Sequence, residues 1–176
     1  MIQHPAEGEY PMIQYFSNYI DLVADEQDVF EVLKRQCDQI VRLYETLILP
    51  EQAEFRYAEG KWSLKEMLGH MVDTERVFAY RAMCIARGEK QSLPGFDENG
   101  YMASAEFAYW SLADLLDYYQ FTRKSNIIMF HNLSEKAQQR IGNANGHPVS
   151  ARAMVWVLAG HEKHHLRILK DRYGLY

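Results

Sequence analysis

Two histidines one helical turn apart, His161 and His165, have the spacing best suited to chemistry in this sequence. They lie in a proline-free segment from Ser150 to Tyr173 with apolar residues at helical intervals, which predicts a long helix. Residues four apart on a helix are displaced by about 40° around the axis and about 6 Å along it, so both imidazoles project the same way. Such a pair can hold one metal ion from two sides. His164, the residue before His165, points about 100° away from it.

The apolar positions of this segment indicate where the two histidines point. Its apolar stripe consists of Met154, Leu158, Ile168 and Leu169, and positions 161 and 165 fill the gap in it. Two polar rings facing a core need partners, because burying them unpaired would cost on the order of a few kcal/mol. A divalent metal would satisfy both rings. One alternative is a pair of hydrogen-bonded core histidines. The other is that the apolar face of the helix is assigned one residue out of step, so that the histidines do not face the core.

A third histidine, His70, lies on the inward stripe of another predicted helix. Taken alone, a histidine on an apolar helix face is more often a hydrogen-bonded core residue than a ligand. In a helical bundle, however, metal ligands come from facing helices, and His70 would complete a set of three neutral nitrogen donors. Three histidines and an open position resemble a catalytic zinc site, although nickel, iron or copper would also suit nitrogen donors. A metal held in this way lowers the pKa of a water or thiol that reaches it.

The neighbours of these histidines suggest supporting and substrate-binding roles. A ligating ring is expected to donate its second N–H to an outer partner, for which Asp73, Glu75 and Asn126 are candidates. Thr74 and Arg81, which follow His70 on its stripe, and Asn126 on a different helix are candidates for lining a polar pocket. Together they suggest a hydrophilic cavity inside an apolar bundle. The alternative is that these side chains face solvent.

Four long helices are predicted to position these residues. The second has the sequence signature of a capping box, with Ser63 followed three residues later by Glu66. The predicted spans are Glu26–Ile48, Ser63–Arg87, Ser111–Leu133 and Ser150–Tyr173. A short helix or turn packed against the bundle is predicted near 12–23. Short helices are predicted near 102–109 and 134–140, a loop over 88–100, and a turn or small hairpin over 141–149. The expected fold is one all-α domain, residues 1–176, most simply a four-helix bundle.

Composition excludes several classes of function. The 19 Lys and Arg residues against 24 Asp and Glu give a net charge of −5, with no dense basic cluster, so nucleic-acid binding is disfavoured. Neither a signal peptide nor an 18-residue apolar run is found, which predicts a cytoplasmic protein that does not cross a membrane. Cys37 and Cys84 form no metal-type spacing and are expected to be free thiols used in packing.

Several short motifs in this chain resemble those of the DinB/YfiT-like superfamily, over a stretch from about the first long helix to the C-terminus. They are Gly60-Lys61-Trp62-Ser63, Leu68-Gly69-His70, Asp73-Thr74-Glu75-Arg76, Ala86-Arg87-Gly88-Glu89, Pro94-Gly95-Phe96-Asp97 and Gly160-His161-Glu162-Lys163-His164-His165. The resemblance implies a four-helix bundle in a variant up-and-down arrangement. It also implies a metal held by one histidine of the second long helix and two of the last, which correspond to His70, His161 and His165.

The resemblance implies an activity only in outline, since known members include bacillithiol-dependent thiol S-transferases and a mycothiol-dependent isomerase. The first hypothesis is therefore a transferase that activates a low-molecular-weight, bacillithiol-like thiol on the metal for attack on an electrophilic small molecule. The second is metal-assisted hydrolysis, with Asp73 or Glu162 as base, although both look like outward-facing or supporting residues. The third is a stress-related protein that binds a metal or small molecule without turnover. The many aromatic residues, 12 tyrosines among them, would suit a homodimer interface or a tightly filled core.

Overall fold

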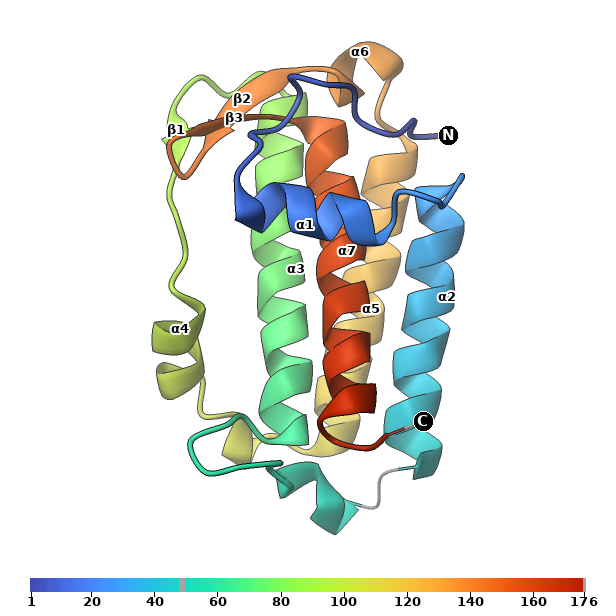
Figure 1. The fold of residues 1–176 in the computed structure, drawn as a ribbon, viewed down its shortest axis with the longest axis vertical. Coiled ribbons are helices and arrows are strands. Elements are labelled where there is room, and N and C mark those ends of the chain that lie inside the picture. Colours follow the sequence, from blue (N-terminus) through green and yellow to red (C-terminus); the bar gives the residue numbers. More distant parts are fainter. Residues whose placement is uncertain (48–49, 176) are drawn as a thin grey trace.

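The computed structural model describes residues 1–47 and 50–175, and its main feature is a bundle of four long helices (Figure 1). The helices are α2 (Val29–Arg42), α3 (Leu64–Ala86), α5 (Leu112–His131) and α7 (Ala151–Asp171). The predicted all-α four-helix bundle is confirmed. Within the described ranges, no helix is both long and apolar enough to cross a lipid bilayer.

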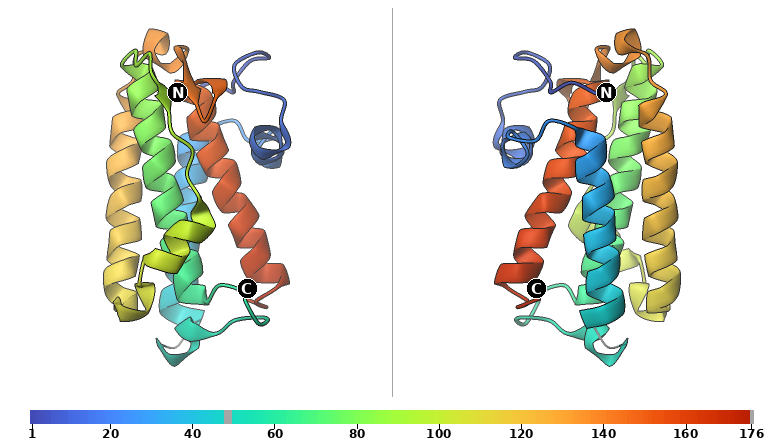
Figure 2. Two further views of the ribbon diagram at one scale, coloured as in Figure 1. Left: turned by 90° about the vertical axis from the view of Figure 1, so that its left-hand side faces the viewer. Right: turned by 90° about the vertical axis from the view of Figure 1, so that its right-hand side faces the viewer.

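The order of the helices around the bundle differs from a simple up-and-down arrangement. α2 lies beside α5 and α7, and α3 also lies beside α5 and α7, so helices α2 and α3 are diagonal to one another. α3 and α5 run in the same direction, opposite to α2 and α7 (Figures 1 and 2). The chain must therefore return along the outside of the bundle between α3 and α5, which explains the long predicted loop after Gly88.

Serine caps fix where the long helices begin. Ser63, Ser111 and Ser150 each accept a hydrogen bond from the backbone N–H three residues later. The predicted capping box is confirmed, because Glu66 also accepts a hydrogen bond from the Ser63 N–H. The first long helix is shorter than predicted: α2 is followed by one π-helical turn, Leu43–Leu47, and Ile48 lies outside the described residues.

Short elements occupy the connections. They are α1 (Gln14–Leu22), α4 (Glu98–Ser104), α6 (Glu135–Gln138) and two 3-10 turns, Pro50–Glu54 and Phe107–Tyr109. The helix predicted over 102–109 begins earlier, because the Asp97 side chain caps α4 by accepting from the N–H groups of Asn99 and Gly100.

A three-stranded sheet closes one end of the bundle and was only partly predicted. β2 (Ile141–Ala144) and β3 (His147–Ser150) form the predicted hairpin, with Asn145 and Gly146 both at positive φ in the turn. β1 (Ser92–Leu93) pairs with β2 in parallel. A strand of two residues gives no alternating pattern, so the sequence offered no signal for it.

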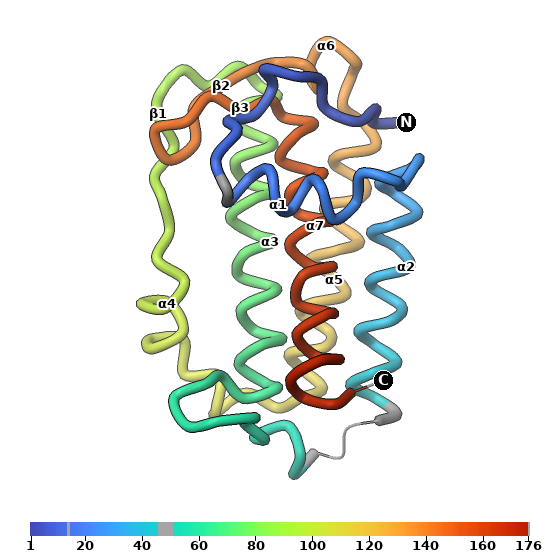
Figure 3. The backbone as a smooth tube through the Cα atoms, viewed as in Figure 1, coloured from blue at the N-terminus to red at the C-terminus, as the bar shows by residue number. Residues whose placement is uncertain are grey.

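α7 is buried on nearly all sides along its first half. Residues from Ala151 to Glu162 are all buried, because α1 crosses the side of α7 that faces away from the bundle (Figures 1 and 3). The backbones touch at Gly160, where an added Cβ would lie 1.8 Å from the carbonyl oxygen of Tyr19. The two free cysteines are Cys37, which is buried, and Cys84, which is half-buried.

Candidate metal centre

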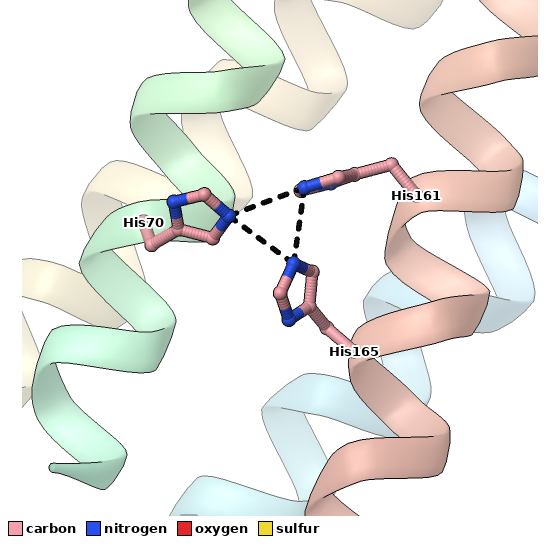
Figure 4. Close-up of side chains that lie close together, drawn as sticks. All are labelled: His70, His161 and His165. Carbon is pink, nitrogen blue, oxygen red and sulfur yellow. Dashed lines mark hydrogen bonds between the residues drawn. The ribbon is translucent and has the colours of Figure 1, made fainter. Parts of the chain in front are cut away.

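Three histidines meet between α3 and α7 (Figure 4). His70 comes from α3 and His161 and His165 come from successive turns of α7. The Nε2 atom of His70 lies 3.2 Å from that of His161 and 3.1 Å from that of His165, and the latter two are 3.0 Å apart. All three side chains are buried. The structure thus brings together the three residues that the sequence proposed as ligands.

Hydrogen bonding alone cannot satisfy this triangle of nitrogens. Each Nε2 of a neutral imidazole is either a donor or an acceptor. With two states and three atoms, at least one pair must consist of two donors or two acceptors, which repel. Donor atoms of a tetrahedral site with metal–nitrogen bonds of about 2.0–2.1 Å lie about 3.3–3.4 Å apart, close to the separations seen here. The three Nε2 atoms are therefore better arranged to coordinate a metal ion than to form hydrogen bonds with one another.

The environment keeps the three rings neutral. Burial lowers the pKa of His70 to about 4, and the charge of His164 adds to the effect. Burial also holds the pKa of His161 and of His165 well below the usual histidine value, with neighbouring histidines lowering it further. A neutral imidazole retains the lone pair that a metal requires.

The partners predicted for the second ring nitrogens lie elsewhere. Asp73 lines a separate cavity beside α4, together with Asp97 and Tyr101. Glu75 accepts hydrogen bonds from Arg123 and Asn126, not from a histidine. Within the described chain, the Nδ1 atom of His165 is buried and has no hydrogen-bond partner. Aromatic rings hold the histidines instead: Trp62 lies 4.6 Å from His70, and Tyr19 lies 5.3 Å from His161, measured between ring centroids.

A small cavity of about 130 Å³ opens beside the triangle. Besides the three histidines it is lined by Tyr15, Tyr19, Trp62, Thr74, Phe96, Glu98 and His164. Thr74, one of the predicted pocket residues, lines this cavity, and its buried Oγ1 has no hydrogen-bond partner among the described residues. His164, which points away from His165, is half-buried beneath α1 and also lines this cavity.

Two other predicted pocket residues are not part of this cavity. Arg81 reaches past it and donates to the carbonyl oxygen of Pro94 at 2.7 Å, holding the connection that follows β1. Asn126 lies on α5 and donates to Glu75 at 3.1 Å. Glu75 is also bound by Arg123, so Asn126 belongs to the polar groups of the bundle interior and not to the cavity.

The bundle interior contains a charged cluster that sequence reasoning did not find. Arg123 on α5 donates to both carboxylate oxygens of Glu75, at 2.8–3.0 Å, and also to Glu162 on α7. Tyr119 donates to Glu162 at 2.7 Å. Glu162, which was expected to be an outward-facing or a supporting residue, is buried, and burial raises its pKa although Arg123 opposes the shift. Its neighbour in sequence, His161, faces the metal centre, so the two face different parts of the interior.

Most of this chain matches known proteins. The profile of the DinB superfamily matches residues 33–169. A protein of Oceanobacillus iheyensis that bears the name "putative metal-dependent hydrolase" is 24% identical over 148 residues, which make up 82% of this chain and 84% of that protein.

Two solved structures share the architecture. YfiT from Bacillus subtilis, described as "a probable metal-dependent hydrolase with an unusual four-helix bundle topology", has a TM-score of 0.69 at 14% identity, covering 99% of this chain and 95% of its own. A mycothiol-dependent maleylpyruvate isomerase has a TM-score of 0.64 at 15% identity, covering 85% of this chain and 62% of its own. At these identities the likeness establishes a common fold.

Proposed function

The chain belongs to the DinB superfamily, and we propose that it is a metal-dependent enzyme in which His70, His161 and His165 hold one divalent ion. The observation that carries this proposal is the buried triangle of Nε2 atoms, 3.0–3.2 Å apart, which hydrogen bonds cannot satisfy. Zinc, nickel and iron all accept three nitrogen donors, so the donor set leaves the metal's identity open.

Within this class we favour a transferase that uses a low-molecular-weight thiol. A divalent metal bound by the three histidines would lower the pKa of a thiol that reaches it, so that the thiolate is available at neutral pH. In the transfer the thiol would release its proton to solvent and its sulfur would form a bond to an electrophilic carbon. The bond between that carbon and its leaving group would break, and the leaving group would depart with the electron pair. The cavity residues bind and orient both molecules, and the rings of Trp62 and Tyr19 exclude bulk water. The thiol dependence of a structural neighbour supports this choice.

Metal-dependent hydrolysis is the second candidate, and the names of two similar proteins favour it. Here water would take the place of the thiol, and Glu98 in the cavity wall could receive its proton. Consumption of an electrophile that requires added thiol supports the transferase, whereas ester or amide cleavage without thiol supports the hydrolase. A stable metal centre with neither activity would favour a binding protein without turnover.

The first test is the metal content of protein purified without chelator or nickel resin. We expect about one equivalent per chain, and its loss in both His70→Ala and His161→Ala, because two remaining imidazoles bind far more weakly than three. His147→Ala, in the β2–β3 hairpin, is the matched control and should keep its metal. Substoichiometric metal that none of these substitutions changes would overturn the proposal.

We also propose that the enzyme is a cytoplasmic homodimer. Free thiols at Cys37 and Cys84 suit a reducing compartment. Exposed apolar side chains on the outer surfaces of two neighbouring helices, Tyr80 on α3 and Phe121 and Ile128 on α5, offer a surface for self-association. Sedimentation should give twice the chain mass, and Phe121→Glu should give the mass of one chain. A monomeric parent protein at micromolar concentration would contradict this.

A further inference from the structure

The two helices that carry the three histidines are also joined on a different face, by the charged cluster of Arg123, Glu75 and Glu162. Glu75 follows His70 on α3 by five residues, and Glu162 directly follows His161 on α7. On a helix these separations are turns of about 140° and 100°, with displacements of about 7.5 Å and 1.5 Å along the axis. Both carboxylates therefore lie within two helical turns of the histidines and point away from the cavity, into the bundle interior.

The guanidinium of Arg123 spans the gap between α3 and α7. Its Nε and Nη2 atoms donate to the carboxylate of Glu75 at 2.8–3.0 Å, and Nη2 also donates to Glu162. Tyr119, one turn earlier on α5, donates to Glu162 at 2.7 Å, so two side chains of α5 hold this carboxylate. A guanidinium is planar and the directions of its N–H groups are fixed, so the pairing holds α3 and α7 at a defined separation.

The metal centre requires that this separation is set accurately. His161 and His165 belong to one helix, which fixes their spacing, but the third donor, His70, comes from α3 (Figure 4). Bond lengths between a metal and its ligands have a tolerance of about 0.2 Å. Apolar packing is non-directional and does not position two helices so accurately, whereas hydrogen-bonded ion pairs are directional.

The histidines do not themselves favour this arrangement before a metal binds. Their Nε2 atoms lie 3.0–3.2 Å apart, and at least one pair of them consists of two donors or two acceptors, which repel. If the site is to be preformed, contacts elsewhere between the helices must oppose this repulsion. The charged cluster supplies such contacts, because one guanidinium binds a carboxylate of each helix.

We infer that Arg123, Glu75 and Glu162 are positioning residues, which hold α3 and α7 at the separation at which the three histidines bind one divalent ion. Charged groups in a core are a weak source of stability compared with apolar groups of similar volume, but their directional pairing can specify one arrangement of helices. A site that is held in its binding geometry in advance loses less free energy to ordering when the ion arrives. The inference rests on the proposed function, and it gives the charged cluster a role in metal affinity besides its role in stability.

The test is Arg123→Lys, which keeps the net charge of the cluster. Attraction between the divalent ion and the two carboxylates is therefore retained, but an ammonium on a flexible stem cannot reproduce the fork that joins Glu75 to Glu162. We expect the zinc dissociation constant, measured by competition with a chromogenic chelator, to rise at least about tenfold, the lower end of the effect of removing a group that supports metal ligands. The visible absorption of the cobalt(II)-loaded variant should also weaken or shift, because it reports the coordination geometry.

A second variant and a matched control keep the test specific. Tyr119→Phe leaves every charge in place and removes one hydrogen bond to Glu162, so the zinc affinity should fall by a smaller factor. This variant alone decides if Arg123→Lys does not fold. Val149→Ala, which removes two buried methyl groups in β3 at the end of the bundle closed by the sheet, should lower stability but retain the parent's zinc affinity and cobalt spectrum. Each constant is measured where circular dichroism shows the metal-free variant to be folded.

Each outcome has a distinct meaning. Parent-like zinc affinity and an unchanged cobalt spectrum in both Arg123→Lys and Tyr119→Phe would overturn this inference and leave the metal-dependent function intact. An equal loss of zinc affinity in Val149→Ala would also overturn it, because a general loosening of the fold would then explain the effect. A parent protein that binds no zinc would overturn the inference together with the proposed function.

Discussion

At the scale of single residues, Arg123 places a positive charge in the interior of the bundle. Its side chain is 1% exposed and its guanidinium lies between the carboxylates of Glu75 and Glu162. It also donates to the carbonyl oxygen of Leu33 at 2.8 Å, so one side chain connects α5 with α2, α3 and α7. Burying charges is unfavourable, and only this near-complete pairing offsets it. The two carboxylates in turn depend on Arg123 to pair their buried negative charges.

Replacing Arg123 should therefore be among the most damaging single substitutions. Arg123→Ala leaves Glu75 and Glu162 buried without their cation, and we expect the free energy of unfolding to fall by about 3–5 kcal/mol. Urea unfolding of metal-free protein measures the effect. Lys124→Ala, at the next and exposed position of α5, is the control and should change stability by less than about 0.5 kcal/mol. Similar losses of unfolding free energy in the two variants would show that the ion pairs of Arg123 with Glu75 and Glu162 do not hold the helices together.

At the scale of elements, the contact between α1 and α7 shapes the metal centre. α1 supplies Tyr15 and Tyr19 to the cavity, and it can lie against α7 only because position 160 has no side chain. The ring of Tyr19 packs against both His161 and His164. Without α1, one side of the histidine centre would be open to water.

Gly160→Ala tests this arrangement. The added Cβ would meet the Tyr19 backbone at 1.8 Å, and a backbone cannot rotate away as a side chain can, so α1 must move. We expect a loss of about 1–3 kcal/mol in stability and faster amide hydrogen exchange over residues 14–22. Gly69→Ala in α3 is the comparison, since its Cβ would meet the movable end of the Phe107 side chain. Unchanged exchange in α1 of the Gly160 variant would contradict the proposed contact.

At the scale of the whole molecule, local signals predicted the helices well and long-range packing poorly. Helical periodicity and serine caps placed α3, α5 and α7 within a few residues, and the spacing of His161 and His165 selected the site. The sequence left Glu162 as either an outward-facing or a supporting residue, because a charged residue is normally assigned to the outside of a helix. Its burial depends on Arg123, 39 residues away. Nothing local in residues 12–23 indicates that this helix covers α7 and carries two cavity residues.

A second long-range contact, centred on Glu9, joins the N-terminal segment to the start of α7. Its carboxylate accepts hydrogen bonds from Ser150 at 2.8 Å and from Arg152 Nε at 2.6 Å, and its carbonyl oxygen accepts from the Ser150 N–H. This contact holds the N-terminal segment against the start of α7. Burial by itself would raise the pKa of Glu9, but the hydrogen bonds from Arg152 and Ser150 lower it below its ordinary value of 4.5.

A lowered pKa in the folded state means that ionised Glu9 stabilises the fold above pH 4.5 and that this stabilisation is lost as the pH falls through the folded-state value. Glu9→Gln should thus lower the free energy of unfolding at pH 7 by about 1.5–3 kcal/mol, the range for hydrogen bonds to charged groups. The difference from the parent protein should shrink below pH 4.5, because the unfolded parent then takes up a proton at Glu9 while the folded parent still resists protonation. Urea midpoints at pH 7 and pH 3.5, measured with chelator, provide the comparison, and exposed Glu7→Gln should show no difference at either pH. A deficit of the Glu9 variant that persists unchanged at pH 3.5 would mean that the shape of this side chain, not its charge, joins the N-terminal segment to α7.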